Sequence, residues 1–281
     1  MIKLLRANFY RFAKNKLFWV CVFAAFAVTA AWTLSEASKA AAYAAAGEGE
    51  LFSLEEVHFS FIPLLPTLFA AFASMFFGTE YADRTIRNRL VSGNTRNAVY
   101  FSSLLTASIG SLVITAAWFA GGVPGIRFCG TWSLSPAEMA QYLCVIVLAA
   151  LSYTAILTFW FMLCDNKALN VVLSLAAVGA IVLCGSVLYQ VLSEDEFTQA
   201  AYYYDGTDFV WMPGGEPNPH YIGGALRVLL TTLLYLLPGG QAILAANIEI
   251  ETPLVMCLYS VIVIVVVSAL GNHLFKKKDL K

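Results

Sequence analysis

Residues 252–275 read TPLVMCLYSVIVIVVVSALGNHLF, a run without any Asp, Glu, Lys or Arg. Its centre, Val261–Val267, is almost purely β-branched, a composition that favours a strand in water. A helix rises about 1.5 Å per residue, so about 20 apolar residues span the roughly 30 Å hydrocarbon core of a bilayer. Because lipid offers backbone groups no hydrogen-bond partners, a run of this length is predicted to be a membrane-spanning helix.

Five further apolar runs precede this one. We predict spans near 17–35, 59–79, 98–123, 139–164 and 168–193, with the last at 252–275. The composition agrees, because 59% of the residues are hydrophobic and only 12% are charged, whereas soluble domains carry about 25% charged residues. The sequence therefore predicts one all-α polytopic membrane domain over 1–281. It excludes an ordinary soluble enzyme, a disordered chain and a secreted disulfide scaffold.

A seventh apolar run, Val228–Ile248, is interrupted by Pro238, Gly239 and Gly240. The interruption leaves two pieces too short to span a bilayer, and the glycines let the chain reverse direction at little steric cost. The run is either a helix that crosses the membrane or a helical pair that enters and leaves on the outer side. We predict the second, with an outer loop and re-entrant segment over 194–251.

The distribution of basic residues predicts how the spans are oriented. With six spans and a cytoplasmic N-terminus, only Lys39, Arg127 and Arg227 of the 17 Lys and Arg residues lie outside. Because loops rich in Lys and Arg stay on the cytoplasmic side, we expect a plasma-membrane protein with both termini in the cytoplasm. A crossing by the seventh run would move the basic end Lys276–Lys278 outside, which favours the re-entrant interpretation.

The basic segment 1–16 has an amphipathic pattern. One face of a helix would carry Ile2, Leu5, Phe9 and Phe12, and the other faces would carry Lys3, Arg6, Arg11 and Lys14. The pattern predicts a helix that lies at the cytoplasmic membrane interface. The alternatives are a basic flank without regular structure and a cleavable signal peptide, and the length of the basic region argues against the signal peptide.

The predicted cytoplasmic loop 80–98 is the most informative polar segment. Residues 78–96 read GTEYADRTIRNRLVSGNTR, a short helical pattern that is broken at Gly93. Its arginines can pair with acidic residues along the helix or donate paired hydrogen bonds to an acidic partner. The candidate coupling residues are Glu80, Asp83, Arg84, Thr85, Arg87, Arg89, Gly93 and Arg96. The alternative is a basic loop that only orients the protein in the membrane.

This loop resembles that of the permease subunits of ABC-2 type transporters, particularly the bacteriocin and lantibiotic immunity branch. The family typically shows an acidic residue, a basic stretch that begins with Thr, and a Gly followed by Ser/Thr-Arg. Glu80, Thr85, Arg87, Gly93 and Arg96 match this pattern. The basic N-terminal helix, the six spans, the segment Pro238–Gln241 and the ending Phe275–Asp279 extend the similarity. Many relatives have Gly-Thr where this chain has Arg84-Thr85.

The resemblance implies a subunit of an ATP-driven exporter that moves a peptide-antibiotic-like or amphipathic substrate outward. Besides the lipid bilayer, it implies two partners, an ABC ATPase subunit and a second permease copy that is identical or paralogous. ATP and Mg would bind to the ATPase, and this chain is expected to bind no cofactor. The loop 80–98 would couple the ATPase to the spans, and Pro238–Gly240 would cap the exit.

Several features are missing from the sequence. It has no G-x-x-x-x-G-K-[ST] phosphate loop, no CxxC pair among its six cysteines, and no metal-ligand spacing at its three histidines. The predicted spans lack Asp, Glu, Lys and Arg, which disfavours an ion-coupled carrier, and no nucleic-acid partner is expected.

Three other interpretations remain open. The acidic and aromatic loop 193–227 is a candidate cation site or a solvated cap. An ATPase-independent membrane protein, such as a sensor or an assembly factor, is the main alternative function. An intramembrane enzyme is disfavoured, because the spans contain no catalytic set of residues.

Overall fold

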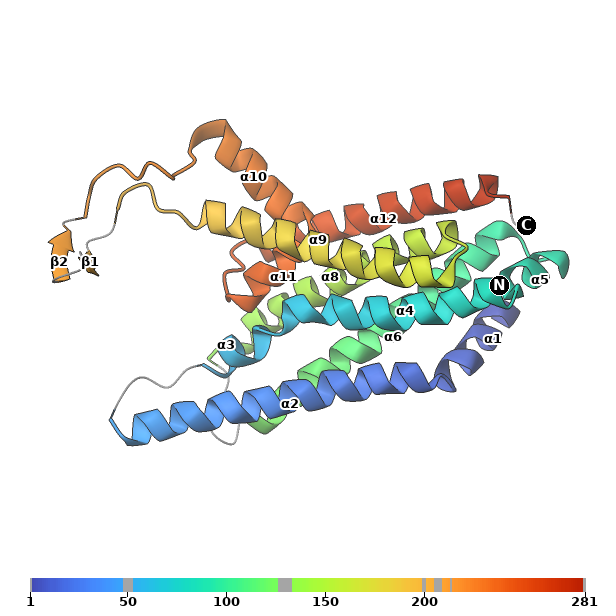
Figure 1. The fold of residues 1–281 in the computed structure, drawn as a ribbon, viewed down its shortest axis with the longest axis horizontal. Helices are drawn as coiled ribbons and strands as arrows, with labels where there is room; N and C mark the ends of the chain where they lie inside the picture. Colours follow the sequence, from blue (N-terminus) through green and yellow to red (C-terminus); the bar gives the residue numbers. More distant parts are fainter. Residues whose placement is uncertain are drawn as a thin grey trace.

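The computed structural model describes residues 2–47, 53–125, 133–198, 201–204, 209–212 and 214–279. Helices dominate the described chain (Figure 1). Their bounds are α1 Ile2–Ala13, α2 Lys16–Ala45, α3 Leu54–Phe59, η1 Ile62–Leu64, α4 Leu65–Ala82, α5 Thr85–Val91, α6 Arg96–Gly122, η2 Val123–Gly125, α8 Pro136–Leu163, α9 Lys167–Leu192, α10 Gly224–Leu236, α11 Pro238–Ala246 and α12 Pro253–Lys277. Two short strands, β1 Ala201–Tyr204 and β2 Phe209–Met212, form an antiparallel hairpin in the loop expected to be outside.

The all-α architecture with six spans is confirmed. Six segments are long and apolar enough to cross a bilayer, namely Lys16–Ala45, Leu54–Ala82, Arg96–Gly125, Pro136–Leu163, Lys167–Leu192 and Pro253–Lys277. The helices run beyond the charge-free runs, and four of them begin at polar N-caps, namely Asn15, Thr95, Ser135 and Asn166. The second span begins with Ser53, which caps α3 by accepting a hydrogen bond from the Glu56 amide. The helical segment continues past Glu80, beyond the charge-free run predicted to end at residue 79, and the helices Lys16–Ala45 and Pro136–Leu163 likewise include Glu36 and Glu138.

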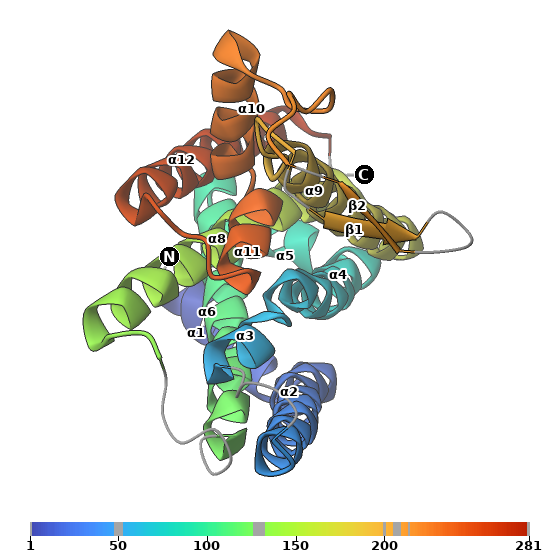
Figure 2. The same cartoon turned by 90° about the vertical axis from the view of Figure 1, so that its left-hand side faces the viewer.

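The spans run side by side along the long axis of the molecule. Figure 1 shows α1, α5 and the end of α12 at one end of the bundle, and β1, β2 and the start of α10 at the other. Viewed from that second end, α11 lies in front of α8, and α2 lies at the edge of the bundle (Figure 2). The elements near the two chain ends therefore gather at one end, as the charge distribution predicts.

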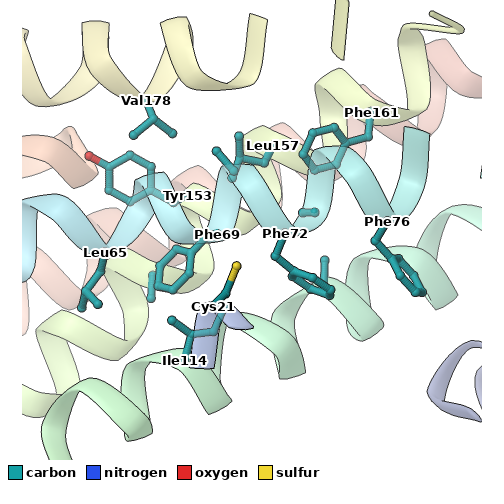
Figure 3. Close-up of a cluster of buried hydrophobic side chains, with 14 of the residues drawn as sticks. Cys21, Leu65, Phe69, Phe72, Phe76, Ile114, Tyr153, Leu157, Phe161 and Val178 are labelled. Carbon is teal, nitrogen blue, oxygen red and sulfur yellow. The ribbon is translucent and has the colours of Figure 1, made fainter. Parts of the chain in front are cut away.

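A core of aromatic side chains joins the inner spans. Phe77 of α4 stacks on Phe161 of α8 with ring centroids 5.7 Å apart. Figure 3 shows the neighbouring side chains, from Cys21, Leu65, Phe69, Phe72, Phe76, Ile114, Tyr153, Leu157, Phe161 and Val178. Buried Cys21 acts here as a packing residue. Outside this core the bundle is also apolar, because α2, α9 and α12 expose side chains such as Phe23, Leu183 and Val265. Surfaces of that kind belong in lipid or against another protein.

The seventh apolar run forms the predicted bent helical pair. α10 and α11 meet at an angle of 90° and both lie toward the end of the bundle that carries the hairpin. Pro238 is the first residue of α11, where a helix tolerates the missing amide hydrogen. The chain turns at Leu237, before the glycines, and neither Gly239 nor Gly240 adopts a positive φ. A Cβ at Gly239 would lie 2.2 Å from the Ile181 carbonyl oxygen of α9, so glycine is needed there for close packing.

Candidate functional site: the loop between α4 and α6

Glu80 occupies the last turn of α4 and its side chain is fully buried. Its carboxylate accepts two hydrogen bonds from the Arg89 guanidinium of α5, at 2.6 and 3.2 Å, and one from Arg11 of α1 at 2.5 Å. One carboxylate therefore connects α4 and the next helix, α5, to α1, whose Arg11 lies 69 residues before Glu80 in the chain. We call Arg11, Glu80 and Arg89 the clasp.

The clasp compensates the cost of burying charge. Taking a carboxylate out of water costs several kcal/mol, and only close, paired hydrogen bonds offset that cost. Arg89 supplies such a pair and is itself about nine-tenths buried. Arg11 is one-third exposed, and its guanidinium also lies 5.6 Å from the centre of the Phe76 ring. Two guanidinium groups on one carboxylate leave the clasp with a net positive charge.

Backbone geometry places α5 as a separate short helix. Arg84 adopts the left-handed conformation with φ 53°, which reverses the chain between α4 and α5. Gly93 has φ 89°, a conformation that glycine adopts without strain, and it ends α5. Asn94 then donates from its side-chain amide to the Arg89 carbonyl, and Thr95 caps α6 by accepting from the Ala98 amide. The predicted break at Gly93 is therefore a pair of helix caps.

Arg96 lies at the opposite side of this loop and faces the end of α12. Its guanidinium donates to the Phe275 carbonyl at 2.8 Å and to the Lys278 carbonyl. Lys278 in turn pairs with Asp165 in the turn between α8 and α9 and donates to the Met162 carbonyl at 3.2 Å. Arg96 therefore ties the C-terminal segment to the loop.

The eight residues that the sequence singles out differ in where the structure places them. Glu80 and Arg89 lie inside the clasp, and Arg96 holds the C-terminal segment. Asp83, Arg84, Arg87 and Gly93 are exposed, and Thr85 is half-buried. Sequence reasoning missed Val91, which is 80% exposed at the end of α5. The available signal was an apolar residue four positions after Arg87, which places both on one side of a helix.

α1 packs on the bundle through one face, whereas the apolar face seen in the sequence is predicted to lie at the membrane interface. Leu4, Asn8 and Phe12 are buried, whereas Ile2 is 83% exposed. Only Phe12 of the predicted apolar face is buried, because its ring fits between the neighbouring aromatic rings of α2 and α4. The helix itself is present, and its position at a membrane interface stays a prediction.

The segment Pro238–Gln241 is enclosed at the other end of the bundle. The Gln241 side-chain amide donates to the Tyr235 and Met256 carbonyls at 2.7 and 3.0 Å, and its oxygen accepts from Ser260 at 2.7 Å. These bonds hold α10, α11 and α12 together, which is a structural role that the sequence did not reveal. Among the described residues no group of three or more metal-binding side chains occurs.

The comparisons with known proteins agree with this arrangement. A family model described as ABC-2 family transporter protein matches residues 4–193, a range that runs from within α1 to the end of α9 and includes the whole loop. The curated proteins and the solved structures give no match. Together with the apolar helices, this match identifies the chain as a multi-pass membrane protein and as the permease subunit of an ABC transporter. Chains of this family are transport subunits and generally have no catalytic role. The chain belongs to the ABC-2 family of transporter proteins.

Proposed function

We propose that this permease works in an ATP-driven exporter and that the exposed face of α5 is where a separate ABC ATPase subunit docks. The observation that carries the proposal is the division of the loop into a buried clasp and an exposed face. We call Asp83, Arg84, Arg87, Asn88 and Val91 the docking face, because all five are exposed. Their mixture of two arginines and one apolar side chain fits an acidic groove with an apolar pocket.

The clasp connects the docking face mechanically to the membrane-spanning helices. A short helix with seven residues could not transmit a push by itself, because isolated helices of that length are unstable. Arg89 anchors α5 to Glu80 of α4, and Arg11 anchors α1 to the same carboxylate. Closure of the ATPase on bound ATP and Mg would therefore move α1, α4 and α5 as one unit. This chain itself needs no cofactor for that movement.

The apolar surface and the charge distribution support two further parts of the proposal, the second permease copy and the orientation in the membrane. The exposed apolar side chains of α2, α9 and α12 offer area for lipid and for a second permease copy, identical or paralogous. The basic residues near the docking face support a cytoplasmic location for both termini in the plasma membrane. For the cargo we propose an outward-moving peptide-antibiotic-like or amphipathic molecule, as in the bacteriocin-immunity branch that the loop resembles.

Co-purification with candidate ABC ATPase subunits from the same organism tests the docking. We expect the double change Arg87→Glu and Val91→Ser to reduce the bound ATPase at least tenfold, because it removes charge and apolar area together. A tenfold loss corresponds to about 1.4 kcal/mol. The matched control is Lys39→Glu with Tyr43→Ser, two exposed positions near the far end of α2.

The outcomes separate docking from folding. Both double variants should keep the melting temperature of the wild type, because the changed side chains are exposed. If the two double variants co-purify equal amounts of ATPase, the loop does not dock the ATPase and only orients the protein in the membrane. A wild-type chain that never binds an ATPase would favour the ATPase-independent membrane protein.

A further inference from the structure

A cavity of about 520 Å³ lies between α9, α10, α11 and the connection from α11 to α12. It is far from the docking face, toward the end of the bundle that carries the hairpin. Its wall includes Tyr189, Arg227, Tyr235, Leu244, Glu249 and Glu251. Pockets that hold small organic molecules occupy about 300–1,000 Å³, so this volume suits such a ligand.

The charged groups of the wall differ in how many hydrogen bonds they already make with the protein. The Arg227 guanidinium donates to the Leu192 carbonyl at 2.8 Å and lies 4.8 Å from the centre of the Tyr221 ring. Glu249 accepts one hydrogen bond, from the Tyr189 hydroxyl at 3.0 Å, which leaves its second oxygen available. Glu251 makes no hydrogen bond or ion pair with the described residues. The wall therefore offers acceptors for a cation more readily than donors for an anion.

The remainder of the wall combines apolar side chains with the hydroxyl groups of Ser193 and Thr231. Leu234, Leu244 and Ile250 line the first cavity. A second cavity of about 440 Å³ shares Arg227, Thr231 and Tyr235 with the first and runs between α10 and α12 beside Val255. An extended apolar tail could follow this second cavity to the exposed surface of α12.

The acidic part of the wall follows a residue with a strained backbone. Ile248 lines the cavity with φ 58°, a left-handed conformation that is unfavourable for a β-branched residue. Hydrogen bonds from the Ile248 amide to the Ala245 carbonyl and from the Glu249 amide to the Leu244 carbonyl keep it there. Strain of this kind persists where the surroundings enforce it and gathers at ligand sites.

We infer that this cavity binds an amphipathic molecule with an ammonium group, which pairs with Glu249 and Glu251 while the apolar tail lies along α10. The inference rests on the proposed export function, for which it supplies the substrate class and a site near the exit. The same chemistry fits two sources, a transported cationic amphiphile and a membrane lipid with an amine headgroup.

Photo-crosslinking of the full chain in nanodiscs tests the site without any ATPase. The probe is an alkylamine with a diazirine in its tail, and the matched probe is the alkyl sulfate of the same chain, both in nanodiscs whose lipids lack primary amines. We expect the amine to label peptides that contain residues 189–193, 227–235 or 244–251 at least tenfold more than the sulfate. Equal labelling by the two probes would overturn the inference, because it would reflect partition into lipid alone.

Charge variants identify the carboxylates. Glu249→Gln with Glu251→Gln should lower amine labelling at least tenfold, and Glu251→Gln alone, which breaks no described hydrogen bond, at least threefold. The control Glu196→Gln with Glu216→Gln removes two outer carboxylates that do not line the cavity and should leave labelling unchanged. Undiminished labelling of the cavity variants at an unchanged melting temperature would disprove the site.

A second set of nanodiscs distinguishes the two sources. Protection from labelling by lipids with an amine headgroup would identify such a lipid as the occupant. Unchanged labelling would identify a transported amphiphile. Because no arm contains the ATPase, failure of the docking proposal leaves this result intact, and failure here leaves docking intact.

Discussion

Glu80 shows how one residue can decide the role of a whole loop. In the sequence it is the first charge after an apolar run, where an exposed position would be ordinary. In the structure its carboxylate is fully buried and holds Arg11 and Arg89. The same charge that ends a hydrophobic segment therefore connects three helices.

Replacing Glu80 by Gln should destabilise the protein strongly. The change keeps the shape of the side chain but leaves two guanidinium groups without a counter-charge, and breaking a buried ion pair costs about 3–5 kcal/mol. Each kcal/mol corresponds to about 2–4 °C for a chain of about this size, so the melting temperature in nanodiscs should fall by about 6 °C or more. Asp83→Asn is the control, and because Asp83 is exposed, it should change stability by less than about 0.5 kcal/mol. Similar melting temperatures for the two variants would show that the clasp contributes nothing.

At the scale of elements, α11 depends on its glycines for contact with α9 and α10. A Cβ at Gly239 would lie 2.2 Å from the Ile181 carbonyl oxygen, and one at Gly240 would lie 2.1 Å from the Leu234 carbonyl oxygen. Both neighbours are backbone atoms, which cannot rotate away. α11 is therefore held at the bundle by close backbone packing and by the hydrogen bonds of Gln241.

Gly239→Ala should separate α11 from α9. Overpacking of this kind costs about 1–3 kcal/mol, and the melting temperature should fall accordingly. Gly179→Ala is the matched control, because Gly179 lies on α9 with open space around its Cα. Alanine is the better helix former, so this control should gain about 0.5–1 kcal/mol. A neutral Gly239→Ala would contradict the packing role given to this glycine.

The whole molecule has two ends with different tasks. One end carries the clasp, the docking face and the C-terminal segment, and the other carries the hairpin, the bent helical pair and the cavity. The spans between them are joined by the aromatic core. Under the proposed docking, movement of the ATPase would have to pass along the spans to reach the cavity.

Cysteine labelling in a cysteine-free background tests this arrangement in the membrane. Asn88→Cys and Lys277→Cys should react with a membrane-impermeant reagent only from the cytoplasmic side, and Glu216→Cys only from outside. All three side chains are exposed. The sequence also pointed to Asp205 as an outer position, which lies outside the described residues. Opposite sides for residues 88 and 277 would mean that the pair α10 and α11 crosses the membrane.

The sequence by itself determined the six spans, the break at Pro238 and the gathering of basic residues at one end. These features depend on the length, hydropathy and charge of continuous segments, so they can be predicted without knowing which other segments pack against them. Only the tertiary structure decided that Glu80 and Arg89 are internal while Arg87 and Val91 are exposed, and that Gly239 serves packing. Those roles depend on partners such as Arg11 and Ile181, which only the packing of the helices brings together.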